Sequence, residues 1–242
     1  MNPLSIHIKA IALYTIPMND SCTTKKCFCE CEISLPKHKA IIGEPAPPFT
    51  AMCYENGNIR SISLSSFKGR WVILFFYPHD FTLVCPTEIC SFSDSVSAFS
   101  KLNTAIIGAS TDSVFVHRAY ALTPRKEGGV SPLAIPLMSD ITHSISKEYG
   151  CYINKGSNEG ATVRATYIID PKGILRHVSM NDLNVGRSID ELKRLVEAFQ
   201  FTDENGEVCP MNWRPGKRAM KSDLEAPELK KYFAEELGKE NN

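Results

Sequence analysis

The sequence predicts an α/β sandwich whose central strands are largely parallel. Strand-like and helix-like patterns alternate from Ile41 onward, with a pair of strands near the end. Such alternation is typical of a parallel sheet covered by helices. Two of the segments, Trp71 to Tyr77 (WVILFFY) and Thr104 to Ser110 (TAIIGAS), are continuous apolar runs. Runs of this kind are expected of strands that are buried on both faces.

The other elements follow from apolar spacing and from proline and glycine breakers. After a Pro-rich entry at 43–48, a short strand is expected at 59–64. A helix is expected from Pro86 to Leu102, because proline is tolerated in the first helical turn and apolar residues recur at helical spacing. The remaining expected helices are 113–122, 143–149, 188–199 and 228–237, and the remaining expected strands are 135–138, 166–169 and 174–180.

The composition is that of an ordinary globular protein and excludes several classes of partner. The chain has 242 residues, 27 basic and 27 acidic, and 43% of it is hydrophobic. A net charge of zero argues against nucleic acid and weakens the case for an anionic membrane surface. The longest apolar run of the core, Trp71 to Pro78, has eight residues, whereas a membrane span needs about 20. We therefore expect no nucleic-acid and no membrane partner.

Three regions are expected along the chain. Residues 1–38 are interpreted as a variable, cysteine-containing extension, 39–201 as the main folded domain and 202–242 as a polar C-terminal tail. Within the extension, Ala10 to Met18 resembles a weak signal-peptide core, but one charge precedes it and no clean cleavage site follows. We expect a cytoplasmic protein, and the alternative is an organelle or secretion through the atypical extension.

The nine cysteines favour reduced thiols over a disulfide framework, because nine is odd and the chain is long for such a scaffold. Four of them lie in the extension, where they could bind zinc or copper(I), become glutathionylated or have no such role: Cys22, Cys27, Cys29 and Cys31. Three others fall in apolar surroundings and are expected to be buried and inert: Cys53, Cys90 and Cys151. The six histidines show no metal-ligand spacing.

Cys85 is the most informative residue, because it lies where a buried strand gives way to a helix. A helix N-terminus presents unpaired N–H groups and a partial positive charge, which stabilise a thiolate. Thr82, three residues earlier, can hydrogen-bond that thiolate or an incoming peroxide oxygen, and Pro78 can exclude water from the thiolate. Position alone leaves two interpretations open, a reactive thiolate and a buried inert cysteine. A metal site through Cys85 and Cys90 is disfavoured by their spacing.

Three segments resemble motifs of a known family. Residues 76–88 (FYPHDFTLVCPTE) are similar to the P-x-x-x-T-x-x-C motif around the peroxidatic cysteine of the peroxiredoxins. Residues 206–216 (GEVCPMNWRPG) resemble the resolving-cysteine motif of the typical two-cysteine subgroup, and 181–188 (NDLNVGRS) is a third match. The resemblance covers Ile41 to Phe233. It implies a thioredoxin-like fold, with a central mixed sheet flanked by helices and a tail that carries the resolving cysteine.

The resemblance also implies roles for individual residues. Cys85 would attack a peroxide and become a sulfenic acid, and Cys209, normally of the partner subunit, would condense with it to an intersubunit disulfide. Arg164 would stabilise the thiolate and the charge that develops on the peroxide oxygens. Glu88 would orient that arginine, and Arg187 would support the site less directly.

The implied activity is that of a thiol-specific peroxidase for hydrogen peroxide and small organic hydroperoxides. A thioredoxin-like dithiol protein would reduce the disulfide, and the chain would form a homodimer and then a decamer of five dimers. No metal or other cofactor is implied, because a sulfenic acid is the first step of ordinary thiol oxidation. Two alternatives stay open: a holdase chaperone built from ring assemblies, and a redox relay that passes oxidation from Cys85 to a partner protein.

The sequence departs from the family pattern at several positions. His79 stands where the family usually has an apolar residue, and Arg164 lacks the commoner aromatic flanks. The subgroup that is easily over-oxidised carries a Gly-Gly-Leu-Gly loop and a C-terminal Tyr-Phe. Here the loop reads Gly128-Gly129-Val130-Ser131, whereas Tyr232-Phe233 is retained. We expect the Tyr-Phe helix to pack over the active site, and sensitivity to over-oxidation to lie between the resistant and sensitive extremes.

Overall fold

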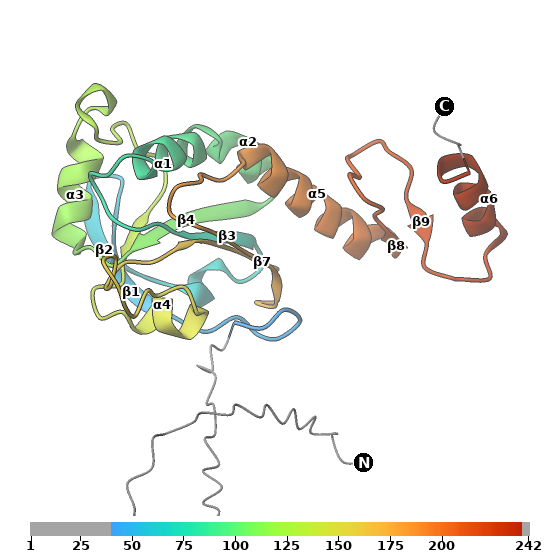
Figure 1. The fold of residues 1–242 in the computed structure, drawn as a ribbon, viewed down its shortest axis with the longest axis horizontal. Helices are drawn as coiled ribbons and strands as arrows, with labels where there is room; N and C mark the ends of the chain where they lie inside the picture. The colour runs from blue at the N-terminus through green and yellow to red at the C-terminus, as the bar shows by residue number, and fades with distance from the viewer. Residues whose placement is uncertain (1–39, 239–242) are drawn as a thin grey trace, which may run out of the picture. The chain divides into compact units, whose positions relative to one another are not determined.

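A seven-stranded mixed sheet forms the centre of the fold (Figure 1). The computed structural model describes residues 40–238. The strand order is β2-β1-β5-β4-β3-β6-β7. The strands are β1 (Thr50–Glu55), β2 (Asn58–Ser63), β3 (Trp71–Phe76), β4 (Thr104–Ser110), β5 (Leu137–Ser139), β6 (Arg164–Ile169) and β7 (Leu175–Asn181). A separate two-stranded sheet pairs β8 (Glu207–Val208) with β9 (Met220–Lys221).

The centre of the large sheet is parallel, as the sequence predicts. Strand β4 pairs in parallel with β3 and with β5. The pairs β1–β2, β1–β5, β3–β6 and β6–β7 are antiparallel, so the sheet as a whole is mixed. Every residue of β3 and β4 is buried, which confirms that the two apolar runs are strands covered on both faces.

Six α-helices lie among the described residues. They are α1 (Cys85–Asp94), α2 (Val96–Lys101), α3 (Val114–Leu122), α4 (Ser144–Tyr149), α5 (Ile189–Asn205) and α6 (Pro227–Glu236). The single helix expected from Pro86 to Leu102 is wrong, because the chain divides it at Ser95. The Ser95 hydroxyl donates to the Ser91 carbonyl at 2.8 Å. Such a bond competes with the regular backbone ladder of a helix.

Two further differences have local causes. Strand β1 forms a hairpin with β2, and its turn residues Asn56 and Gly57 have φ values of 49° and 84°. An Asn-Gly pair is the usual sequence signal for such a turn, so this pair could have revealed the strand. Helix α5 runs on to Asn205, past the expected end at 199. The added turn carries Phe201, whose ring packs at 4.7 Å from that of Trp213.

The two faces of the sheet support two separate hydrophobic cores. Successive β3 side chains alternate between them, as the two-residue period of a strand requires: Val72, Leu74 and Phe76 enter one core, and Ile73 and Phe75 enter the other. The second core is built from residues of α1, α2, α3 and α5 and includes Cys85. Phe75 stacks on Phe92 of α1, with ring centroids 4.0 Å apart. This contact fixes the helix that carries Cys85 against the sheet.

Candidate active site

Cys85 is the first residue of α1 and is fully buried. Pro86 lies in the first helical turn, as predicted. The backbone N–H groups of Thr87 and Glu88 donate to the Val84 carbonyl at 3.1 and 3.3 Å, which closes that turn. The thiol therefore lies at a helix N-terminus, where the backbone favours a negative charge.

Arg164, the first residue of β6, faces the sulfur of Cys85. Its Nη1 donates to Cys85 Sγ at 3.4 Å and to Glu88 Oε2 at 2.7 Å. Its Nε donates to the Leu183 carbonyl at 2.8 Å. The residue is only 4% exposed, so the guanidinium is held in one orientation and shielded from water. A buried cation beside the sulfur stabilises a thiolate and any negative charge that develops during its attack.

Glu88 lies between two arginines. Its Oε1 accepts from the backbone N and the Nε of Arg187 at 2.9 and 2.8 Å, and its Oε2 accepts from Arg187 Nη2 at 2.8 Å. Nη1 of Arg187 donates to the Phe76 and Ala165 carbonyls, both at 2.9 Å. The Arg187 side chain is 5% exposed. Arg187 thus ties α1 to β3 and β6, and it fixes the carboxylate that in turn orients Arg164.

The electrostatics of this cluster keep Glu88 ionised. Burial alone would raise the pKa of its carboxyl group. The hydrogen bonds from Arg187 and the charges of Arg187 and Arg164 together outweigh burial, and they leave the pKa below its ordinary value. A carboxylate held in this way accepts hydrogen bonds from both guanidinium groups at neutral pH.

Glu88 is therefore expected to contribute to stability against acid. Because its pKa is lower in the folded chain, this stability is complete above the unfolded pKa of about 4.3 and is lost as the pH falls through the lower folded value. We expect the unfolding free energy of Glu88→Gln, measured with urea from about pH 6 down to about pH 3, to depend less on pH than that of the wild type. Asp94→Asn, in an exposed pair with Arg125, is the control and should change the slope little. If the unfolding free energy of Glu88→Gln varies with pH as steeply as that of the wild type, the prediction is contradicted.

The expected hydrogen bond from Thr82 to the Cys85 thiolate or to an incoming peroxide oxygen stays a prediction, and in the structure the Thr82 side chain has another partner. Its hydroxyl donates to the His79 carbonyl at 3.0 Å, the residue is exposed, and no hydrogen bond between the described residues joins it to Cys85. Phe81, just before it, has a φ of 54°, which is unusual for a bulky residue. This left-handed turn directs the Thr82 side chain to the preceding backbone. Pro78 is buried just after β3, and its role in excluding water from Cys85 stays a prediction.

Comparisons with known proteins agree with this geometry. Residues 42–178 match the AhpC/TSA family, and 198–235 match the C-terminal domain of 1-Cys peroxiredoxin. Peroxiredoxin-2 of Rattus norvegicus is 51% identical over 195 residues, which are 81% of this chain and 96% of that protein. The chain belongs to the peroxiredoxin family. It is a typical two-cysteine peroxiredoxin and an enzyme of the peroxidase class.

Solved structures confirm the fold of this peroxiredoxin. The reduced 2-Cys peroxiredoxin of Plasmodium vivax superposes with a TM-score of 0.71 at 39% identity, covering 75% of this chain and 93% of that one. The mitochondrial 2-cys peroxiredoxin of Plasmodium falciparum gives a TM-score of 0.66 at 37% identity, covering 70% of this chain and 100% of that one. The expected thioredoxin-like fold is therefore correct.

Cys209 of the peroxiredoxin directly follows β8 and is half-buried. Its Sγ lies 3.8 Å from the Ala198 carbonyl of α5, and partial burial raises the pKa of its thiol. Trp213 is 3% exposed and its Nε1 donates to the Lys217 carbonyl at 3.0 Å. Trp213 is therefore a packing anchor, which holds the Cys209 segment on α5 through contacts with Phe201 and Arg194.

Tyr232 and Phe233 lie in α6. The guanidinium of Arg218 lies 5.2 Å from the centre of the Tyr232 ring, and Phe233 is 44% exposed. Their expected packing over an active site stays a prediction. The structure places Tyr232 against residues of its own tail.

Gly128 and Gly129 of the peroxiredoxin each meet a local requirement. Gly128 has a φ of 81° and ends a short 3-10 turn, a conformation that glycine adopts without strain. A Cβ atom on Gly129 would lie 2.1 Å from the Thr123 carbonyl oxygen. Val130, which follows, is fully buried in the core that contains Cys85. The loop therefore keeps its glycines although its third and fourth residues differ from the family pattern.

The other cysteines divide by burial. Cys53 and Cys151 are buried, as predicted, and burial raises the pKa of Cys53 to about 11. Cys90 is only half-buried, which corrects the prediction that it is buried. It lies in α1 within electrostatic range of Arg125 and Asp94, an exposed pair at the edge of the core. The cysteines of the N-terminal extension lie outside the described residues. Within 40–238, no group of three or more potential metal ligands is found.

Sequence reasoning missed a buried polar network just before Cys85. The Tyr77 hydroxyl donates to Asp80 Oδ1 at 2.8 Å, and His117 Nδ1 lies 2.8 Å from Asp80 Oδ2. The side chains of Asp80 and His117 are fully buried. His79 lies 3.6 Å from Asp112, which raises the pKa of the imidazole. These contacts fix the turn between β3 and α1, and no short-range spacing could have revealed them.

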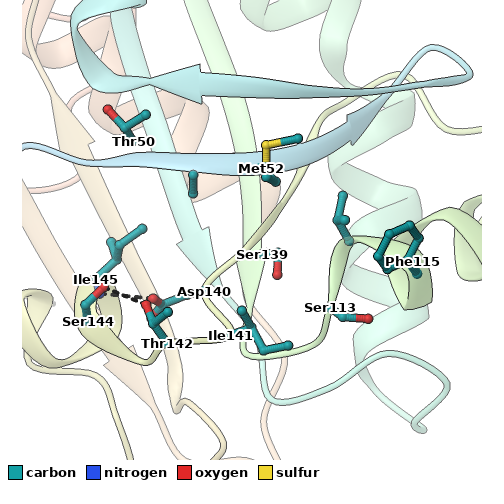
Figure 2. A pocket seen from close by; sticks show the side chains of 12 residues that line it. Thr50, Met52, Ser113, Phe115, Ser139, Asp140, Ile141, Thr142, Ser144 and Ile145 are labelled. Carbon is teal, nitrogen blue, oxygen red and sulfur yellow. Dashed lines mark hydrogen bonds between the residues drawn. The ribbon is translucent and has the colours of Figure 1, made fainter.

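A separate pocket of about 320 Å³ lies between β1 and the beginnings of α3 and α4 (Figure 2). Its walls include Met52, Phe115 and Ile141, and none of the residues around Cys85 lines it. The Asp140 carboxylate accepts the N–H groups of Ile145 and Ser146 at 3.1 and 2.7 Å. Its charge therefore stabilises the N-terminus of α4.

Within the described residues, no helix is long and apolar enough to span a membrane.

Proposed function

We propose that Cys85 reduces hydrogen peroxide and small organic hydroperoxides. The observation that carries this proposal is the 3.4 Å hydrogen bond from Arg164 to the fully buried sulfur of Cys85. A cation that is already oriented at the sulfur costs no reorganisation when negative charge moves onto the peroxide. Pro78, buried nearby in the chain, excludes water from the same sulfur in this proposal.

In the first step, the Cys85 thiolate attacks one peroxide oxygen. A sulfur–oxygen bond forms, the oxygen–oxygen bond breaks, and sulfur loses two electrons. The leaving oxygen takes up a proton and departs as water or an alcohol, and Cys85 becomes a sulfenic acid. Arg164 stabilises the charge on the reacting atoms, Glu88 orients Arg164, and Arg187 holds Glu88.

In the second step, Cys209 of the partner subunit attacks the sulfenic sulfur. A disulfide forms and water leaves, and a thioredoxin-like dithiol protein then reduces the disulfide. This sequence of steps requires at least a homodimer, and we propose a decamer of five dimers. The matches to the typical two-cysteine subgroup support these assignments, together with the position of Cys209 in a tail segment anchored by Trp213. The tail 202–242 is then the resolving segment of the peroxidase domain 39–201.

Cys209→Ser is expected to stop recycling without stopping the first oxidation. Cys85 still reacts with one equivalent of peroxide, because Cys209 is not needed to form the sulfenic acid. The disulfide-linked dimer then disappears from non-reducing gels, and turnover with a thioredoxin system falls to background. Cys151→Ser, which removes a buried thiol, is the control and should retain the dimer. Persistence of the peroxide-induced dimer in Cys209→Ser would overturn the assignment.

Over-oxidation of Cys85 should be intermediate in extent. A second peroxide competes with Cys209 for the sulfenic acid. The retained Tyr232 and Phe233 should favour over-oxidation, whereas the altered loop at Val130 and Ser131 should favour the disulfide. Mass spectrometry after a peroxide titration measures the fraction of Cys85 present as sulfinic acid. We expect this fraction to rise only at high excess. An absence of sulfinic acid even there, or its full formation at only two equivalents of peroxide, would contradict the prediction.

We propose a cytoplasmic location. The five cysteines of the described residues are all free thiols, which suits a reducing compartment. A fluorescent fusion at the C-terminus, with the N-terminal extension intact, tests this proposal. Accumulation in an organelle or in the medium would overturn it.

A further inference from the structure

Tyr120 carries a buried hydroxyl group that has no partner among the described residues. The side chain lies on α3 and is fully buried. Among the buried side-chain nitrogen and oxygen atoms of residues 40–238, the Tyr120 Oη is the one without a hydrogen-bond partner. The other fully buried tyrosines are paired. Tyr77 donates to Asp80 at 2.8 Å, Tyr149 to the Pro47 carbonyl at 2.8 Å and Tyr167 to the Tyr149 carbonyl at 2.6 Å. Buried polar groups are nearly always satisfied, so this exception requires an explanation.

Tyr120 belongs to the surroundings of Cys85. Both residues lie in the same buried cluster. The Tyr120 ring centroid is 4.7 Å from that of Phe81, four residues before Cys85, and the Tyr120 carbonyl accepts the N–H of Val130 at 3.3 Å. Burial raises the pKa of the hydroxyl well above its ordinary value, and negative charge at Asp80 and Cys85 raises it further. The group therefore stays protonated and can donate.

We propose that the Tyr120 hydroxyl donates a hydrogen bond to an oxygen that Cys85 gains on oxidation. The inference rests on the proposed function, because Cys85 must be the oxidised thiol. The reduced thiol of Cys85 carries no oxygen that could accept this hydrogen bond. The first peroxide leaves one oxygen on sulfur. A second peroxide converts the sulfenic to the sulfinic acid by forming another sulfur–oxygen bond and breaking its own oxygen–oxygen bond. Sulfur loses two more electrons, and water or an alcohol leaves.

Tyr120 is thus a positioning residue for the oxidised site. By stabilising the oxygenated sulfur inside the folded pocket, it delays the encounter of Cys85 with Cys209 and leaves more time for a second peroxide. Removing only its oxygen should shift the outcome toward the disulfide. The same removal should leave the reduced protein as stable as before or more stable, because no protein hydrogen bond is lost.

The test compares Tyr120→Phe with its parent in a full-length Cys209→Ser background, which prevents the disulfide. Thermal unfolding is measured for the reduced form and for the form over-oxidised with excess peroxide, with Cys85 sulfinic acid verified by mass spectrometry. We expect Tyr120→Phe to leave the midpoint of the reduced form unchanged or higher, and to lower that of the over-oxidised form by roughly 3 °C. Tyr149→Phe, which loses the bond to Pro47, should lower both midpoints equally.

Each outcome decides the inference. If Tyr120→Phe shifts the unfolding midpoint equally in both redox forms, the inference is overturned, and the hydroxyl instead binds a water molecule or serves only in packing. Absence of any peroxide oxidation of Cys85 in the parent, to sulfenic or sulfinic acid, overturns the proposed function instead, and the inference falls with it. A parent that forms the sulfenic acid but no sulfinic acid keeps the proposed function and overturns the inference. A second measurement uses the chain that retains Cys209. There, Tyr120→Phe should at least halve the sulfinic fraction at a fixed peroxide dose, and an unchanged fraction overturns the inference.

Discussion

Cys85→Ser is expected to lower the rate of peroxide reduction by at least about 1000-fold. A serine hydroxyl at this position is a far weaker nucleophile than a thiolate, and loss of a nucleophile removes most of an enzyme's rate enhancement. The assay follows NADPH consumption with thioredoxin, thioredoxin reductase and hydrogen peroxide. Serine is close to cysteine in size, so the buried helix start should keep its structure.

The matched control is Cys90→Ser, five residues along the same helix and half-buried. It should retain nearly full activity, which separates the chemistry at Cys85 from a general effect of serine in α1. Cys85→Ser also distinguishes the two alternative functions, because it abolishes a redox relay but spares a holdase chaperone. Retained peroxidase activity in a folded Cys85→Ser protein would contradict the assignment of the nucleophile.

Arg164→Lys should lower kcat/KM by about 100-fold or more, although it keeps the positive charge. The guanidinium donates in three directions at once, to Cys85, Glu88 and the Leu183 carbonyl. A lysine ammonium on a flexible stem cannot reproduce this planar arrangement. Loss of one oriented donor to a developing negative charge typically costs about 100- to 1000-fold.

The measurement is the second-order rate constant of Cys85 oxidation, with the fold verified by circular dichroism. Arg125→Lys is the control, because Arg125 makes a two-point pair with Asp94 at 2.9 and 2.7 Å at the exposed edge of the core. It should change the rate less than twofold. A loss of less than about tenfold in a folded Arg164→Lys protein would show that the orientation of the guanidinium contributes little.

Sequence reasoning reached the parts of the site that local pattern controls. The buried strand, the helix start and Cys85 follow one another within a short segment, so hydrophobic runs and Pro86 predict their arrangement. Arg164 and Arg187 could not be found in this way. They lie 79 and 99 residues from their partners Cys85 and Glu88. Their selection came from the family resemblance, and no local spacing indicates that two arginines fold into the same buried pocket.

The errors also have physical causes. The break at Ser95 coincides with a side-chain bond to the backbone, which apolar periodicity does not indicate. The bond from the Thr82 hydroxyl to the His79 carbonyl also escapes prediction, because it follows a left-handed turn at Phe81, while the role of Thr82 toward the thiolate or a peroxide stays a prediction. Such a turn is not expected from a bulky aromatic residue. No strand was predicted at β1, although Asn56-Gly57 is the usual sequence signal for the hairpin turn between β1 and β2.

The two buried arginines and the one carboxylate of the pocket leave it with an unbalanced positive charge. A thiolate at Cys85 makes the pocket electrically neutral, and so does a sulfinate. A disulfide carries no charge and leaves a cation without compensation in a region shielded from water, which is costly. In the proposed cycle, we therefore expect the closed pocket to be stable in the reduced and over-oxidised enzymes and less stable in the disulfide. Hydrogen exchange at the first turn of α1 should accordingly be faster in the disulfide than in the sulfinic form, so that charge on one sulfur atom decides when the site opens to its reductant.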